Sequence, residues 1–126
     1  MLENGKSIRV LVADDERMIA NTLARILSTS GFEAKAVYSG ENAIEAAREL
    51  KPDVLITDVV MGGMTGIEAA MHIIALLPQC RIILFSGQAS TADLLECASA
   101  KGHRFEILTK PIHPRVLLDH LSAPVH

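Results

Sequence analysis

The sequence contains no tryptophan, and its three phenylalanines and one tyrosine make up only 3% of 126 residues. A hydrophobic core must therefore be built mainly from aliphatic side chains. The scarcity of aromatic rings also removes the platforms on which single-stranded nucleic acids stack. Basic residues form no run and the formal net charge is −3, so we expect no direct contact with nucleic acid.

Long hydrophobic runs are missing as well. No apolar stretch reaches the roughly 18 residues that a membrane-spanning helix needs, and the first residues become acidic instead of forming a signal peptide. The two cysteines, Cys80 and Cys97, lack the CxxC spacing of metal and redox sites, and we expect them to be reduced. These absences predict a cytoplasmic protein that does not contact a membrane.

The remaining composition is typical of an ordinary globular domain. Hydrophobic residues account for 49% of the chain and charged residues for 21%, which is close to average usage. The length suits one domain, and no repeat or linker divides the sequence. We therefore expect a single domain over residues 1–126, with its core at about 7–121.

Apolar, β-rich runs alternate along the chain with segments of helical periodicity. The expected strands are residues 8–13, 32–37, 54–57, 81–85 and 105–109. The expected helices are residues 17–30, 39–50, 65–77, 91–101 and 114–121. Strand–helix units in strict alternation predict an α/β fold, in which a parallel sheet lies between helices on both faces.

Acidic residues follow the first and third expected strands. Asp14, Asp15 and Glu16 follow the first strand, where they either complement the dipole of the next helix or form a cation site. Asp58 follows the third. It either caps the next helix or starts a turn, or it stands at the sheet edge where open α/β folds bind ligands. Each pattern alone leaves both interpretations open.

A parallel sheet would bring these acids together with other polar residues. The ends of the first, third, fourth and fifth strands share one edge, and the residues found there are Asp14, Asp15, Asp58, Ser86 and Lys110. Carboxylates placed together repel one another, and oxygen ligands without His or Cys favour Mg²⁺ as the cation that offsets them. Such a site suits a phosphoryl group, with Asp58 as the nucleophile.

Four segments carry a family resemblance over essentially the whole chain. VADDE (12–16), ITDVVMGGMTGIE (56–68), LFSG (84–87) and LTKP (108–111) resemble, in order and spacing, the motifs of response-regulator receiver domains from two-component signalling. The resemblance implies a (βα)5 flavodoxin-like three-layer sandwich whose five-stranded parallel sheet has the order 2-1-3-4-5. It also implies that Mg²⁺ is the cofactor.

The same resemblance assigns the acidic residues to metal binding and phosphorylation. Asp14 and Asp15 would be the Mg²⁺-binding pair, and Asp58 would be both a metal ligand and the phosphoacceptor. The backbone carbonyl of Val60 would complete the protein's metal ligands.

Other positions of the family pattern are either matched or replaced. Ser86 would be the switch hydroxyl, Lys110 would contact the phosphoryl group, and the peptide bond between Lys110 and Pro111 would be cis. The family usually has proline at the position of Gly62, so the loop after the phosphoacceptor should be looser here. It normally has Tyr or Phe at the position of Ile107, which makes Ile107 atypical for the aromatic switch.

These assignments predict a phosphorylation-dependent signalling switch that assists only its own phosphorylation and dephosphorylation and is otherwise not an enzyme. A sensor histidine kinase or histidine phosphotransfer protein would donate the phosphoryl group to Asp58. The fourth helix, fifth strand and fifth helix would then alter their partner surface. No output domain is expected after the fifth helix, and the output partner and homodimerisation on phosphorylation are left open.

Two other classes of function compete with the switch. A Mg²⁺-dependent phosphohydrolase commonly carries a second acid two residues after its nucleophile, where this chain has Val60. A phosphorylation-independent interaction module would be supported by Gly62 and Ile107. However, the five polar residues expected at the sheet edge are all present, which favours the switch.

Overall fold

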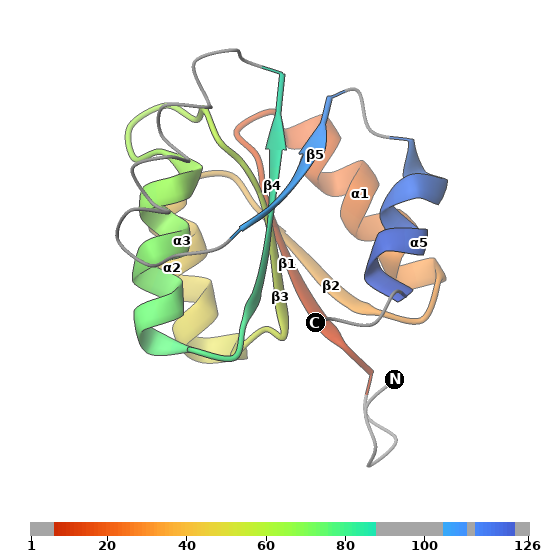
Figure 1. Cartoon of the computed structure of the whole chain (residues 1–126), viewed down its shortest axis with the longest axis horizontal. Helices are drawn as coiled ribbons and strands as arrows, with labels where there is room; N and C mark the ends of the chain where they lie inside the picture. Colours follow the sequence, from red (N-terminus) through yellow and green to blue (C-terminus); the bar gives the residue numbers. More distant parts are fainter. Residues whose placement is uncertain (1–6, 88–104, 111–112, 123–126) are drawn as a thin grey trace.

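The computed structural model describes residues 7–87, 105–110 and 113–122. In it, five parallel strands form one sheet, and helices cover both of its faces (Figure 1). The strands are β1 (Arg9–Ala13), β2 (Glu33–Val37), β3 (Val54–Asp58), β4 (Arg81–Ser86) and β5 (Glu106–Thr109). The helices described are α1 (Arg17–Thr29), α2 (Gly40–Leu50), α3 (Gly66–Leu76) and α5 (Pro114–Ser122). The helix expected at residues 91–101 lies outside the described residues.

The strand order is β2-β1-β3-β4-β5, and every neighbouring pair is parallel. The predicted fold class and strand order are therefore confirmed. Figure 1 shows α2 and α3 on one side of the sheet, with α1 and α5 on the other. Within the described part of the chain, no helix is both long and apolar enough to cross a membrane.

Each described strand and helix begins and ends within one residue of its predicted bounds. Local chemistry explains several of these ends. The Ser39 hydroxyl accepts a hydrogen bond from the Asn42 amide at the start of α2. Thr65 and Glu68 form a reciprocal capping box at the start of α3, a pattern that begins helices. Gly31, at φ +100°, follows the end of α1 in a conformation that suits glycine.

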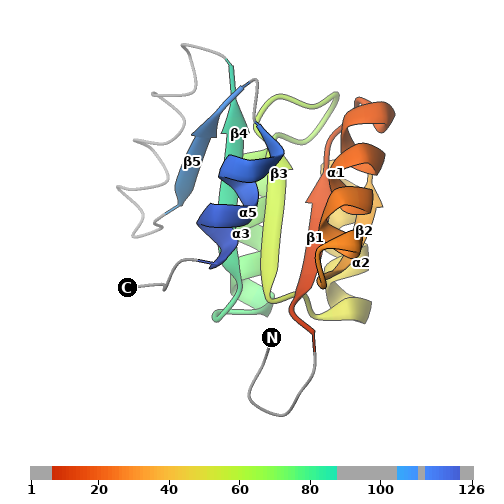
Figure 2. The ribbon, with the colours of Figure 1, turned by 90° about the vertical axis from the view of Figure 1, so that its right-hand side faces the viewer.

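The sheet buries its two faces against different helices (Figure 2). Leu11 and Leu55 belong to the core on the side of α2 and α3, whereas Val12 and Ile56 belong to the core on the side of α1 and α5. Successive strand residues point to opposite faces, so the consecutive apolar residues 10–13 of β1 and 54–56 of β3 contribute to both cores in turn. This burial fixes the position of the polar residues that follow these two central strands.

An ion-pair cluster joins β4, β5 and α5 at the amino-terminal edge of the sheet, opposite the carboxyl-terminal edge where Asp14 and Asp58 lie. Arg81 donates two hydrogen bonds to the Glu106 carboxylate, at 2.5 and 2.6 Å. It donates a third to the backbone carbonyl of His120, at 3.1 Å. Nε2 of His120 lies 2.7 Å from a carboxylate oxygen of Glu106. The hydrogen bond from Arg81, assisted by its charge and by His120, lowers the pKa of Glu106 despite the opposing effect of burial.

We expect Glu106→Gln to lower the free energy of unfolding by about 1–2 kcal/mol near neutral pH, because charge-assisted hydrogen bonds in a partly exposed cluster are weakened. A carboxylate with a lowered pKa stabilises the fold only while it is ionised. The difference between wild type and variant should therefore shrink as the pH falls below the ordinary pKa of a glutamate.

Chemical denaturation at neutral and acidic pH measures this difference, with Glu45→Gln on the exposed surface of α2 as the control. The control should change the free energy of unfolding by less than about 0.5 kcal/mol. A Glu106→Gln effect that does not vary with pH would contradict the ion-pair explanation.

Gly66, the first residue of α3, packs directly against the backbone of Asp58. A Cβ atom at Gly66 would overlap the carbonyl oxygen of Asp58. The Gly66 amide also donates a hydrogen bond to the carbonyl of Val59 at 2.8 Å. The start of α3 can approach the end of β3 this closely only because residue 66 has no side chain.

Gly66→Ala is therefore expected to destabilise the protein by about 1–3 kcal/mol, the usual effect of overpacking a closely packed position. Gly62→Ala provides a matched control on the same loop, because a Cβ atom at Gly62 would meet no atom within 4 Å. Thermal unfolding of both variants measures the effect. Equal stability of the two variants would show that the loop moves freely around residue 66.

Candidate functional site

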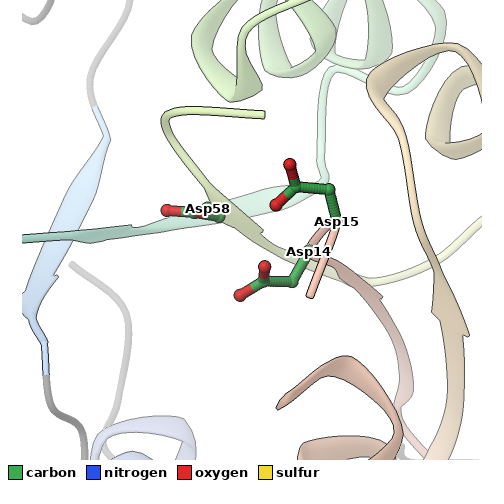
Figure 3. A group of neighbouring side chains, drawn as sticks. All are labelled: Asp14, Asp15 and Asp58. Carbon is green, nitrogen blue, oxygen red and sulfur yellow. The ribbon is translucent and has the colours of Figure 1, made fainter. Parts of the chain in front are cut away.

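Three carboxylates meet at the carboxyl-terminal edge of the sheet. Ala13 of β1 pairs with Thr57 of β3, so the residues that come next, Asp14 and Asp58, lie side by side. Asp15 follows Asp14, and one carboxylate oxygen from each of the three acids lies within 4.8 Å of the others. Figure 3 shows the side chains of Asp14 and Asp15 after β1, beside that of Asp58 at the end of β3. The predicted convergence of these acids is confirmed.

The three acids differ in their exposure to solvent. Asp14 is fully buried and Asp58 is only 7% exposed, whereas Asp15 is exposed. One carboxylate oxygen of Asp14, Oδ1, accepts a hydrogen bond from the Glu16 amide at 2.9 Å. The other, Oδ2, is buried and accepts no hydrogen bond within the described part of the chain. Burying an anionic oxygen without a hydrogen bond is costly, and the ion pair of this oxygen with Lys110 is long, at 3.5 Å. The oxygen therefore indicates a place for a further cationic ligand.

Lys110 supplies the positive charge of the cluster. Its ammonium nitrogen lies 3.2 Å from Oδ1 of Asp58 and 3.5 Å from Oδ2 of Asp14. The Lys110 amide donates a hydrogen bond to the carbonyl of Ser86 at 3.0 Å, which places the residue after β5 beside the end of β4. One ammonium group thus faces three carboxylates, and the site keeps an excess of negative charge when all are ionised.

Burial and the neighbouring charges shift the pKa values of Asp58 and Lys110. Burial raises the pKa of Asp58, and the charges of Asp14 and Asp15 add to that effect, whereas Lys110 opposes it. Burial acts to lower the pKa of Lys110, but the hydrogen bond and charge of Asp58, with those of Asp14, outweigh it and raise the pKa. The pKa of Asp58 rises chiefly because its carboxylate is buried, and the pKa of Lys110 rises because its ammonium group contacts Asp58 and Asp14. A proton on either group reduces the excess of negative charge in the cluster. Binding of a cation would relieve it in the same way.

The residues present fit a magnesium ion. Their donors are all carboxylate oxygens, the ligands that Mg²⁺ prefers. Asp14, whose Oδ2 accepts no hydrogen bond from the described residues, belongs to the same cluster. Glu16 occupies the N-cap position of α1 without a side-chain capping bond and is not part of the cluster. Asp14, Asp15 and Asp58 are thus the acids placed to hold the ion.

The alternative interpretation of Asp58 as a helix cap is wrong, because Thr65 caps α3. The Asp58 side chain instead contacts Lys110.

Three of the other predicted site residues, Ser86, Val60 and Ile107, lie within the described part of the chain. Ser86 is the last residue of β4 and is 8% exposed. Val60, in the loop after β3, is 49% exposed. Ile107, on the edge strand β5, is 45% exposed. Pro111, and with it the expected cis peptide bond, lies outside the described residues.

Sequence reasoning missed one contact to the acidic cluster. The Gly62 amide, in the loop after the expected phosphoacceptor, donates a hydrogen bond to Oδ2 of Asp15 at 3.3 Å. The sequence drew attention to Gly62 as a replacement of proline and as one of the glycines that let the loop backbone approach the Asp58 carboxylate closely. The sequence offers no signal for the bond itself, because it depends on how the loop folds back toward the end of β1.

Comparison with known proteins places this chain in a family. The family model of the response regulator receiver domain matches residues 10–122. The chain is 32% identical to the chemotaxis protein CheY of Thermotoga maritima over 115 residues, which cover 90% of this chain and 94% of that protein. It is 27% identical to the DNA-binding response regulator MtrA of Mycobacterium tuberculosis, over 91% of this chain but only 49% of that protein. The chain therefore spans about half the length of this relative.

Solved structures agree with the sequence comparison. The chemotaxis protein CheY4 of Vibrio cholerae aligns with a TM-score of 0.82 and 27% identity, over 92% of this chain and 97% of that chain. A CheY-like receiver domain protein of Methanospirillum hungatei aligns with a TM-score of 0.83 over 92% of this chain and 91% of that chain. At 22% identity, this second likeness shows the fold alone. Since the family model matches most of its length, the chain belongs to the response-regulator receiver domain family.

Proposed function

We propose that the protein is a phosphorylation-dependent signalling switch in which Asp58 accepts a phosphoryl group in the presence of Mg²⁺. The observation that carries this proposal is the buried carboxylate of Asp58, 3.2 Å from the Lys110 ammonium and clustered with Asp14 and Asp15. A carboxylate held in this way can act as a nucleophile toward phosphorus. The family to which the chain belongs supports the same role.

The transfer forms one bond and breaks one. An oxygen of the Asp58 carboxylate bonds to phosphorus, the bond between phosphorus and the donor's imidazole nitrogen breaks, and its electron pair stays on the imidazole. Asp58 must be ionised to attack, and Lys110 favours the ionised form against the effect of burial. Asp14, Asp15, Asp58 and the carbonyl of Val60 would hold Mg²⁺, which would supply positive charge for the transferring oxygens.

Lys110 and Ser86 have the chemistry to bind the phosphorylated product. The Lys110 ammonium would move its contact from the carboxylate to a phosphoryl oxygen, and the hydroxyl of Ser86, at the end of β4, would donate a hydrogen bond to another. A change at these two positions is transmitted directly to β4 and β5, because each residue belongs to or follows one of these strands. Ile107 has no aromatic ring, so the proposed readout does not use aromatic rotation.

The proposed partners follow from this chemistry. A sensor histidine kinase or a histidine phosphotransfer protein donates the phosphoryl group in the cytoplasm, and an output partner binds a surface that includes β5 and α5. The domain is not an enzyme toward other substrates. Val60, two residues after the nucleophile, is apolar and half exposed, so it cannot act as the proton donor that a phosphohydrolase would need there.

Incubation with Mg²⁺ and a small acyl-phosphate donor is expected to add one phosphoryl group to the wild type and none to Asp58→Asn. Intact mass spectrometry detects the adduct, and hydroxylamine should remove it because it is an acyl phosphate. Asp119→Asn is the matched control, since Asp119 lies exposed on α5. This variant should be phosphorylated like the wild type.

Other outcomes separate the competing functions. If Asp58→Asn still acquired the phosphoryl adduct, Asp58 would not be the phosphoacceptor. Absence of an adduct, together with failure to bind a beryllofluoride mimic of the phosphoryl group, would instead support a phosphorylation-independent interaction module. Turnover of small phosphate esters by the wild type, lost in Asp58→Asn, would support a phosphohydrolase.

A further inference from the structure

The loop after β3 contacts the acidic cluster through the backbone of Gly62. The Gly62 amide lies 3.3 Å from Oδ2 of Asp15, across 47 residues of sequence. Glycine is not required here for conformational reasons, since the glycines of positive φ in the described residues are Gly31 and Gly63. It is not required for space either, because a Cβ atom at residue 62 would meet nothing within 4 Å. What residue 62 contributes to the site is its N–H group, which a proline would lack.

Asp15 is the acid that most needs such a contact. Asp14 is buried and is fixed by the Glu16 amide, and both Asp14 and Asp58 are held by Lys110. Asp15 is exposed, and its two neighbouring carboxylates repel it. An exposed side chain under repulsion turns toward water unless a donor holds it, and the hydrogen bond from Gly62 is directed at this carboxylate.

We propose that the Gly62 amide is a positioning group for Asp15, which holds this carboxylate in the cluster and so raises the affinity of the site for Mg²⁺. The proposal rests on the proposed function, because it assigns Gly62 to the same metal site. Donors that orient a metal ligand strengthen binding because the ligand is already in place when the ion arrives. The same bond connects the loop after the phosphoacceptor to the end of β1.

Two substitutions at one position separate the amide from the side chain. Gly62→Pro removes the N–H group, whereas Gly62→Ala keeps it and places a methyl group in open space. We expect Gly62→Pro to raise the dissociation constant for Mg²⁺ about 10-fold, at the low end of the usual effect of removing a hydrogen bond to a metal ligand. Gly62→Ala should bind Mg²⁺ like the wild type. Isothermal titration calorimetry with Mg²⁺ measures both.

Proline also stiffens the loop, so the comparison is repeated in an Asp15→Ala background. If Gly62 acts through Asp15, Gly62→Pro should have no further effect on Mg²⁺ affinity once the carboxylate is gone. An equal loss of affinity in both backgrounds, or equal affinity of Gly62→Pro and Gly62→Ala in the wild-type background, would overturn the proposal.

The hydrogen bond can also be observed without metal. The amide proton resonance of Gly62 should move upfield in Asp15→Ala, because its acceptor has been removed. An unchanged resonance would overturn the proposal even if Gly62→Pro failed to fold. Absence of Mg²⁺ binding by the wild type would instead refute the proposed function, and the inference with it. If the wild type bound Mg²⁺ and substitutions at residue 62 did not change its affinity, only the inference about Gly62 would be refuted.

Discussion

Repulsion among three carboxylates at one edge of the sheet is the constraint on which the rest of this structure depends. Two like charges about 4 Å apart repel by about 4 kcal/mol at an effective dielectric constant of about 20. A typical domain is stable by only about 5–15 kcal/mol, so this repulsion is a substantial part of the total. Lys110 provides one compensating charge, 3.2 Å from Asp58 and 3.5 Å from Asp14. This one charge faces three carboxylates, so the compensation is incomplete. Burial, together with the charges of Asp14 and Asp15, raises the pKa of Asp58 against the effect of Lys110.

The fold tolerates the charged edge because stability is generated elsewhere. β1 and β3 are buried on both faces between two separate cores, so the residues that follow them cannot separate. The cluster of Arg81, Glu106 and His120 joins β4, β5 and α5 at the other end of the sheet. Gly66 packs closely on the backbone of Asp58 and so fixes the start of α3 against the end of β3. Burial, ion pairing and close packing thus hold in place a group of charges that would separate if free.

Much of this could be predicted from the sequence. The element bounds follow from the alternation of apolar strand segments with helical periodicity, whereas the strand order is implied by the resemblance to receiver domains. A parallel sheet brings the polar strand ends together in any sequence of this kind. Two details could not be predicted: that Oδ2 of Asp14 accepts no hydrogen bond from the described residues, and that the Gly62 amide donates one to Asp15. Both depend on loop geometry at the scale of single hydrogen bonds. The Arg81 cluster joins residues up to 39 positions apart, with no pattern that links them. The greater looseness expected of the Gly62 loop stays a prediction.

The most direct test of this electrostatic account is the free energy of unfolding of the wild type and Asp58→Asn at neutral pH, each measured with a chelator and with excess Mg²⁺. A carboxylate whose pKa is raised by folding costs stability once it is ionised, so Asp58→Asn should be the more stable protein in the chelator. A ligand that binds only the folded state about 100-fold above its dissociation constant adds about 2.7 kcal/mol, and the wild type should gain more from Mg²⁺ than the variant. Equal responses of both proteins to Mg²⁺, with the wild type more stable in the chelator, would contradict the account.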